Sequence, residues 1–95
     1  MICMKIHKVG DSEIVSVCDE NLIGKSFKEK DSCLEITERF YKGEVADGPK
    51  ILEVCDDAKN VNVIGEESVK LFVDAGVISE ESIRKIKGVP FAIIV

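Results

Sequence analysis

Aromatic residues are scarce in this 95-residue chain, which has four Phe, one Tyr and no Trp. A core must therefore be built mainly from Val, Ile and Leu. No apolar run approaches the roughly 18–20 residues that a membrane span needs. The N-terminal MICMKIHKV is interrupted by lysines and is followed by no small-residue cleavage site, so it does not resemble a signal peptide. We expect a cytoplasmic protein that makes no membrane contact.

The chain also lacks the common cofactor motifs. Its four cysteines stand at positions 3, 18, 33 and 55, and no pair has the C-x-x-C spacing of zinc or thioredoxin sites. Gly24-Lys25-Ser26 resembles the end of a P-loop, but Asp19 stands where the first P-loop glycine belongs. These absences predict no cofactor and no metal site.

One thiol cluster remains as an alternative. His7 is the only histidine, and Cys3, Cys18 and His7 fall in the same N-terminal segment, as a metal, redox or catalytic thiol site would require. In the strand register expected below, however, His7 faces Ile14. Its side chain then lies too far from Cys18 for a hydrogen bond.

The composition is that of one globular domain spanning residues 1–95, with 45% hydrophobic and 33% charged residues. The net charge of −5 argues against broad electrostatic binding to nucleic acid. Two local basic segments remain candidates, or else are solvated faces: Lys25, Lys28 and Lys30, and Arg84, Lys85 and Lys87.

Residues 2–8 and 13–18 predict a β-hairpin. Gly10 at the first central position suits a type II′ turn, and in that register Cys3 faces Cys18. One face should point to the core and carries Ile2, Met4, Ile6, Val15 and Val17. The other should be at least partly exposed and carries Cys3, Lys5, His7, Ile14, Ser16 and Cys18.

The rest of the chain predicts a third strand over 33–37, a bend over 38–45, a helix capped by Asp47, and a short helix over 79–82. Strands are expected over 83–87 and 91–95, the last of them inside the sheet. Asp19 is expected to cap a single turn that ends at Gly24. The order β-β-β-α-β-α-β-β predicts an α+β two-layer sandwich, with a mixed sheet of about five to six strands and two main helices on one face.

Residues 60–76 form the expected central joint. A buried strand (61–64) meets Gly65, and an amphipathic helix then runs to Gly76, which suits a left-handed C-terminal cap. A strand–glycine–helix corner can bind phosphate at the helix N-terminus. Glu66 and Glu67 occupy that positive end and would repel an anion, so we interpret the corner as structural.

The candidate working surface lies on the connections instead. Arg39-Phe40-Tyr41-Lys42-Gly43 places aromatic residues among basic ones, a pattern typical of RNA recognition, although at least one of its aromatics should be in the core. The segment 18–27 is the second such connection. The candidate binding residues are Asp19, Lys25, Arg39, Tyr41, Lys42, Arg84, Lys85 and Lys87, and no catalytic residue is assigned.

Four motifs together resemble a known family: Cys18-Asp19-Glu20-x-Leu22-x-Gly24-Lys25-x-Phe27, Phe40-Tyr41-Lys42-Gly43, Asn62-Val63-Ile64-Gly65-Glu66 and Gly88-Val89-Pro90. In this order and at about these spacings they resemble the small archaeal family catalogued as domain of unknown function number 424. The resemblance implies a two-layer sandwich in an archaeal cytoplasmic protein and supplies no activity. That family often has a histidine after the Val-Pro, where this chain has Phe91.

Three functional hypotheses follow. The basic segments and the lack of a catalytic constellation favour a non-enzymatic binding module, working with RNA or the translation machinery. The apolar terminal strand would instead favour a protein-interaction subunit, or a homo-oligomer paired through an edge strand. The third hypothesis is a small thiol-dependent enzyme using Cys3, Cys18 and His7.

Overall fold

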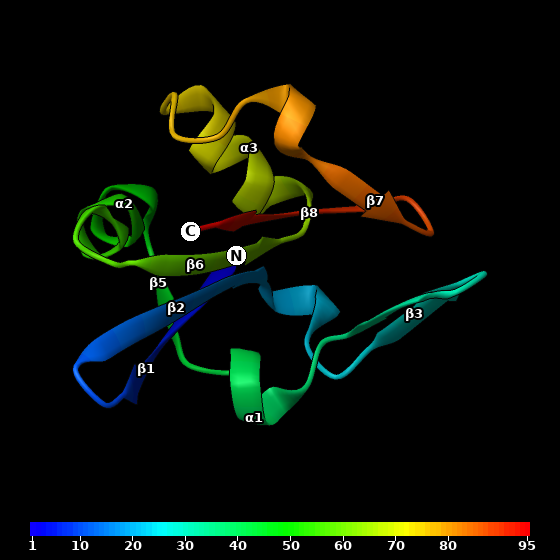
Figure 1. Ribbon diagram of the computed structural model, residues 1–95, viewed down its shortest axis with the longest axis horizontal. Helices are drawn as coiled ribbons and strands as arrows, with labels where there is room; N and C mark the ends of the chain where they lie inside the picture. The colour runs from blue at the N-terminus through cyan, green and yellow to red at the C-terminus, as the bar shows by residue number, and fades with distance from the viewer.

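A computed structural model describes residues 1–95 as a six-stranded mixed sheet with a separate two-stranded hairpin (Figure 1). The strand order is β5-β1-β2-β6-β8-β7. The strands are β1 (Ile2–Val9), β2 (Ser12–Asp19), β5 (Glu44–Ala46), β6 (Asn60–Ile64), β7 (Arg84–Ile86) and β8 (Val89–Ile94). The pair β2–β6 is parallel and all other pairs are antiparallel. The α+β class and the mixed sheet are as predicted.

Two helices cover one face of the sheet, as the sequence predicts (Figure 1). They are α2 (Gly48–Asp56) and α3 (Glu66–Asp74). The Asp47 side chain caps α2 by accepting a hydrogen bond from the Lys50 backbone N–H at 3.0 Å. Ten buried residues, centred on Phe72, fill the space between these helices and the sheet. Both helices have nine residues, far short of the roughly 20 that a bilayer crossing takes.

The N-terminal hairpin has the predicted register, with Cys3 opposite Cys18 and Ile6 opposite Val15. Gly10 has a φ of 62° and Asp11 has a negative φ, which matches the type II′ turn. Ile6 is a correction, because its side chain is 43% exposed rather than part of the core.

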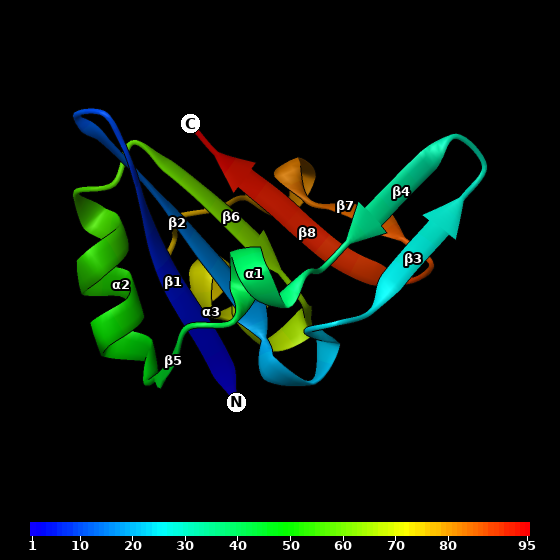
Figure 2. The ribbon, with the colours of Figure 1, turned by 90° about the horizontal axis from the view of Figure 1, so that it is seen from below.

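The second face of the hairpin is also a correction. Lys5, His7 and Ile14 on this face are partly exposed as expected, but Cys3, Ser16 and Cys18 are buried. The short helix α1 (Glu38–Tyr41) covers that face, and the hairpin of β3 (Ser26–Glu29) and β4 (Ser32–Glu35) lies farther along the sheet, beside β7 (Figure 2). They bury a second apolar cluster around Cys18, Ile36, Tyr41 and Ile64. The strand predicted over 33–37 corresponds to β4 of this layer, whereas β3 and α1, of four residues each, were not predicted.

The remaining elements differ from the prediction mainly at their ends. The segment 38–45, expected as a bend, holds α1 and the start of β5. The short helix at 79–82 is a 3₁₀ turn, η2 (Glu80–Ser82), and a second 3₁₀ turn, η1 (Glu20–Leu22), follows β2. The terminal strand lies between β6 and β7 as expected, although Val95 itself is 94% exposed.

Candidate functional site

The two basic segments meet at one end of the molecule. The β3–β4 hairpin lies beside β7, and the Lys87 backbone N–H donates a hydrogen bond to Glu29 Oε2 at 3.3 Å (Figure 2). Six exposed basic side chains stand on these two elements and their flanks; we call them the basic end: Lys25, Lys28, Lys30, Arg84, Lys85 and Lys87. Of the residues predicted to bind, Lys25, Arg84, Lys85 and Lys87 thus lie on these two adjoining elements, with Arg84 and Lys85 on opposite faces of β7.

Packing of the hairpin explains why its lysines face outward. Side chains alternate along a strand, so Phe27 and Leu34, which are paired across β3 and β4, face the sheet together. Both pack against the second apolar cluster, near Phe91 of β8. Lys28 lies between Phe27 and Glu29 in sequence, on the opposite, exposed face of the hairpin. The apolar side therefore anchors the hairpin and leaves its basic side in water.

The basic end also carries the backbone strain of the chain. Lys30 and Lys87 are the two non-glycine residues with positive φ, at 52° and 53°. Each stands at the first position of a two-residue hairpin turn, where Gly, Asn or Asp would be preferred. A lysine there costs roughly 1 kcal/mol relative to glycine. Strain of this kind is concentrated at functional sites, and here it falls on two neighbouring lysines.

A shallow hollow of about 380 Å³ adjoins the basic end, lined by Ser82, Arg84, Phe91, Ala92 and Ile93. Arg84 and Phe91 are paired across β7 and β8, and Phe91 is only half-buried. An aromatic ring beside a guanidinium offers both a stacking surface and a cation. No sequence pattern indicates this hollow, because it depends on β7 ending where β8 continues.

Arg39 and Lys42 lie apart from the basic end. They are on and just after α1, which packs on β1 and β2 (Figure 2). The strands β6 and β8 separate β2 from β7, so three strand spacings, about 14 Å, lie between the two regions of the sheet. The structure therefore does not join Arg39 and Lys42 to Arg84, Lys85 and Lys87.

The aromatics of α1 are occupied by packing. Tyr41 is 9% exposed, and burial, with a smaller contribution from Cys18, raises its pKa to about 12. Phe40 stacks on His7 with ring centroids 4.2 Å apart. The Phe40 carbonyl lies 2.8 Å from both His7 Nε2 and Ser16 Oγ, each of which donates to it. Tyr41 thus belongs to the core, and Phe40 fastens α1 to the sheet.

Asp19 has a different role from the one expected. Its carboxylate does not cap the turn that follows it; instead it crosses to the start of α3, where it accepts three hydrogen bonds. The donors are the Glu67 N–H at 3.1 Å, the Ser68 N–H at 2.8 Å and the Ser68 hydroxyl at 2.7 Å. Asp19 is 6% exposed. The anion position of the α3 N-terminus is therefore filled from within the chain, by Asp19 rather than by the exposed glutamates.

Cys3 and Cys18 of the thiol cluster are buried and paired across β1 and β2. Burial, followed by the nearby Asp19 and Cys3, raises the pKa of the Cys18 thiol to about 12, which disfavours the thiolate. His7 Nε2 donates to the Phe40 carbonyl at 2.8 Å and lies 3.5 Å from Ser16 Oγ, and it makes no hydrogen bond to either thiol. All four cysteines are free thiols. No three His, Cys, Asp or Glu side chains gather closely enough to hold a metal ion.

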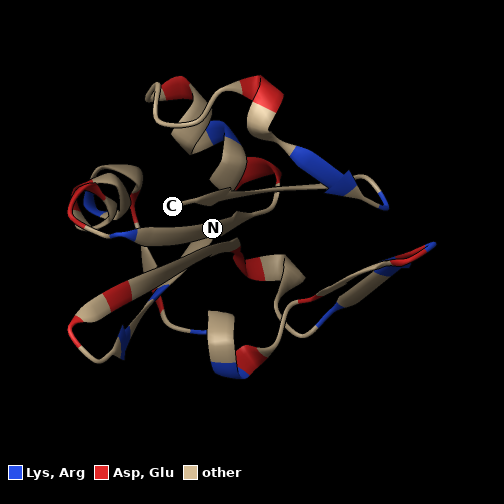
Figure 3. Ribbon diagram, in the orientation of Figure 1, with Lys and Arg blue, Asp and Glu red and all other residues tan.

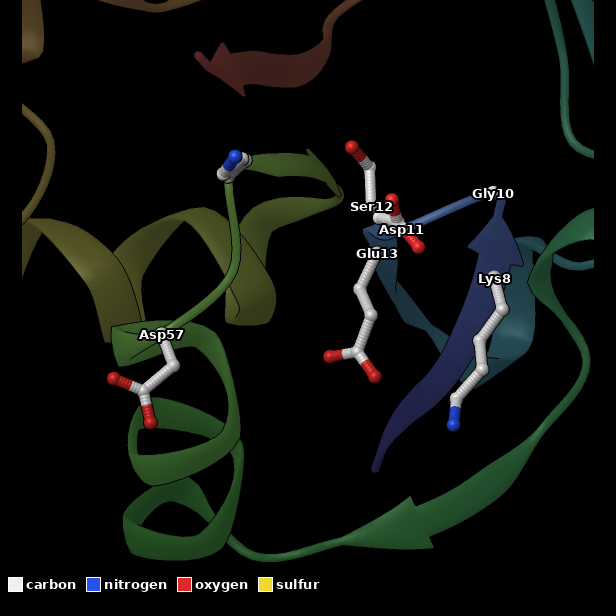
Figure 4. A pocket seen from close by; sticks show the side chains of 7 residues that line it. Lys8, Gly10, Asp11, Ser12, Glu13 and Asp57 are labelled. Atoms are coloured by element: carbon white, nitrogen blue, oxygen red, sulfur yellow. The ribbon is translucent and has the colours of Figure 1, made fainter.

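A second polar hollow, of about 270 Å³, lies between the tip of the β1–β2 hairpin and the end of α2 (Figure 4). Its lining is entirely polar, with three carboxylates against two lysines: Lys8, Gly10, Asp11, Ser12, Glu13, Asp57 and Lys59. The labelled side chains come from the hairpin turn and from Asp57 after α2 (Figure 4). With no apolar wall and charges of both signs, this hollow has nothing to select one ligand, and we treat it as solvated surface.

Comparisons with known proteins agree with this fold. A family model described as "Protein of unknown function (DUF424)" matches residues 7–95. A solved structure described as an uncharacterized conserved protein from Methanopyrus kandleri is similar, with a TM-score of 0.82 and 31% sequence identity. The similarity covers 98% of this chain and 89% of that one. No curated protein matches the chain.

Proposed function

Because the chain belongs to the DUF424 family, whose members are described as being of unknown function, we propose a function from its surface: a non-enzymatic binding module that holds single-stranded RNA at its basic end. The observation that carries the proposal is the juxtaposition of two segments almost sixty residues apart, Lys25–Lys30 and Arg84–Lys87. A chain with a net charge of −5 nonetheless gathers six of its thirteen basic residues on one hairpin and the neighbouring strand.

The charge distribution supports a phosphate-bearing partner. Residues 84–87 carry three basic and no acidic side chains, whereas the β3–β4 hairpin mixes its lysines with Glu29, Asp31 and Glu35 (Figure 3). The acidic remainder of the molecule would repel the rest of a nucleic-acid chain, which restricts binding to this end. Three lysines or arginines in contact with single-stranded phosphates would give a salt slope of about −2.

The neighbouring hollow supports RNA over a simple anion. Phe91 and Ile93 line it beside Arg84, so an unstacked base has an aromatic edge and an apolar wall to contact. Base stacking of this kind contributes roughly 1–3 kcal/mol per base. Phosphate contacts at Lys87 and Lys28 would then position the strand along the hairpin.

Fluorescence anisotropy with a labelled single-stranded 12-nucleotide RNA tests the proposal. The double variant Arg84→Glu/Lys87→Glu should weaken binding at low salt at least tenfold and reduce the salt slope by about 1.4, for two lost phosphate contacts. The matched control is Lys8→Glu/Lys59→Glu, which makes the same charge change in the polar hollow of Figure 4. The RNA affinity of this control should fall by no more than about twofold, the effect of the altered net charge alone. Equal losses in both variants, or no binding of RNA by the unmodified chain at low salt, would reject the proposal.

A second candidate function, self-association through a strand edge, has one specific observation in its favour. The last β7–β8 pair is Arg84 with Phe91, so the edge of β8 from Ala92 to Ile94 has no strand partner on that side. Ile93 on this edge is 59% exposed. Sedimentation velocity over a hundredfold concentration range tests it: a dimer that Ile93→Lys abolishes supports this candidate, and a monomer throughout excludes it.

A further inference from the structure

The side of the molecule away from the basic end holds an apolar hollow of about 380 Å³ between α2 and α3. Seven of its eight lining residues are apolar: Leu52, Cys55, Ala58, Phe72, Ala75, Val77 and Ile94, with Asp56 as the eighth. Phe72 is fully buried and forms the floor, whereas Val77 at the rim is 51% exposed. An apolar hollow with an exposed rim can bind one large apolar side chain of a partner as an anchor residue.

The charges around this hollow are negative. It lies where both helices end, α2 at Asp56 and α3 at Asp74. Neither helix has a basic residue in its last turn, and Asp57 caps α2. Residues 48–83 carry eight Asp or Glu against three Lys, a net charge of −5 that equals that of the whole chain (Figure 3).

Helix dipoles add to this negative field. The C-terminal end of a helix carries partial negative charge, so each aspartate placed there costs about 0.3–1 kcal/mol instead of stabilising the helix. Lys70 offsets one of them through an ion pair with Asp74 at 3.0 Å, and Lys59 follows α2. Asp56 and Asp57 have no ion-pair partner in the structure. A Lys or Arg side chain of a partner would offset the unfavourable charge of these aspartates.

We propose that this hollow docks a basic amphipathic helix of a partner protein, with one bulky apolar side chain in the hollow and Lys or Arg residues beside Asp56 and the acidic ends of α2 and α3. Apolar faces of helices commonly bind in the groove between two other helices. The acidic residues around the hollow select basic helices over neutral ones, and the attraction between the opposite charges raises the association rate. This surface is independent of the basic end, so the proposal does not rest on RNA binding.

A direct probe is a 14-residue peptide of Leu and Lys, with Leu at helical spacing and a single Trp in place of one Leu at an anchor position. The chain has no Trp, so the emission of the peptide reports its environment without interference. The expected result is a blue shift on binding, weakened at least tenfold by Val77→Lys and about threefold by Asp56→Asn/Asp57→Asn. Val45→Lys, on the remote strand β5 where Val45 is 42% exposed, is the matched control and should leave the affinity within twofold.

The cysteines of the unmodified chain supply a second readout that needs no variant. Cys55 lines the hollow and Cys33 is exposed on the β3–β4 hairpin. Saturating peptide should slow alkylation of Cys55 at least fivefold and leave that of Cys33 unchanged. Unchanged Cys55 alkylation, or equal binding of a scrambled peptide of the same composition, would overturn the proposal. Self-association at micromolar concentration that Val77→Lys abolishes would also overturn it, in favour of a second copy of this chain as occupant.

Discussion

The carboxylate of Asp19, at the end of β2, accepts hydrogen bonds from both the backbone N–H and the hydroxyl of Ser68, at 2.8 and 2.7 Å. Forty-nine residues separate the two in sequence. The contact ties the parallel pair β2–β6 to the first turn of α3, so it joins the strand and helix layers at one point. It also occupies the anion position that a strand–glycine–helix corner would otherwise offer a ligand.

Removing this contact should destabilise the fold. Asp19→Ala deletes three hydrogen bonds to a buried carboxylate and leaves Ser68 unsatisfied, so we expect a loss of about 3 kcal/mol in the free energy of unfolding. Ser68→Ala removes only one bond and should cost about 1 kcal/mol. Urea unfolding at pH 7 measures both. Asp47→Ala, at the exposed cap of α2, is the control at about 1 kcal/mol, and an Asp19→Ala loss no larger than this would contradict the role assigned to Asp19.

Gly65 should tolerate no side chain. Its φ is 108°, and a Cβ added there would clash with the carboxylate carbon of Asp19. We expect Gly65→Ala to lower the free energy of unfolding by about 3 kcal/mol or more, because it combines strain with displacement of the Asp19 cap. Gly76→Ala is the matched control: its φ is also positive, at 75°, but nothing lies within 4 Å of the added Cβ. That variant should lose only about 1 kcal/mol, and similar losses in both variants would show that backbone strain alone matters.

Stability should fall in alkaline solution. Burial raises the pKa of Cys18 from 9.0 to about 12 and that of Cys55 from 9.0 to about 11. The folded state therefore keeps protons that the unfolded state releases. This contribution is complete below about pH 9 and is lost as the pH rises through the folded-state values. The expected slope is roughly 1.4 kcal/mol per pH unit for each such group.

Urea unfolding between pH 8 and 11 measures this slope. Cys18→Ala should reduce this slope by roughly 1.4 kcal/mol per pH unit, the contribution of one proton. Cys33→Ala, at an exposed position, should leave the slope unchanged. A flat profile to pH 11 in the unmodified chain would mean that these thiols are not buried as described.

Lys87→Gly should improve stability and impair binding together. Glycine adopts the positive φ of 53° without strain, so the free energy of unfolding should rise by about 0.5–1 kcal/mol. The same change removes one phosphate contact, and RNA affinity should fall at least threefold at low salt. Thermal unfolding and anisotropy measured on one preparation test this trade-off. A stabilised variant with unchanged RNA affinity would show that the strained turn does not serve RNA binding.

The sequence predicted the elements that bury a regular apolar face. Residues 60–64 and 66–76 were recognisable because period-two and period-3.6 patterns meet at Gly65. The hairpin register followed from Gly10 and the turn type it permits. In the second layer, the alternation of Leu34 and Ile36 predicted the strand over 33–37, whereas α1 and β3 were not predictable in this way, because four residues show no clear period.

The candidate site was predictable only in its composition. Arg84–Lys87 and Lys25–Lys30 are visible as charge clusters, but their proximity depends on how the β3–β4 hairpin packs against β7. Asp19 and Tyr41 were candidates because of their polar groups and neighbours. The structure places both inside, since a carboxylate can be buried when helix N–H groups satisfy it and a tyrosine when apolar side chains surround its ring.

Chemical-shift mapping by two-dimensional NMR tests the RNA site most directly. Single-stranded 12-nucleotide RNA is added to the ¹⁵N-labelled chain at low salt, and the amide shifts of every residue are followed. Binding at the basic end predicts that the largest shifts lie in residues 25–36 and 82–93, with residues 48–59 of α2 and its end unaffected. Shifts centred on Arg39–Lys42, or spread evenly over the surface, would contradict binding at the basic end.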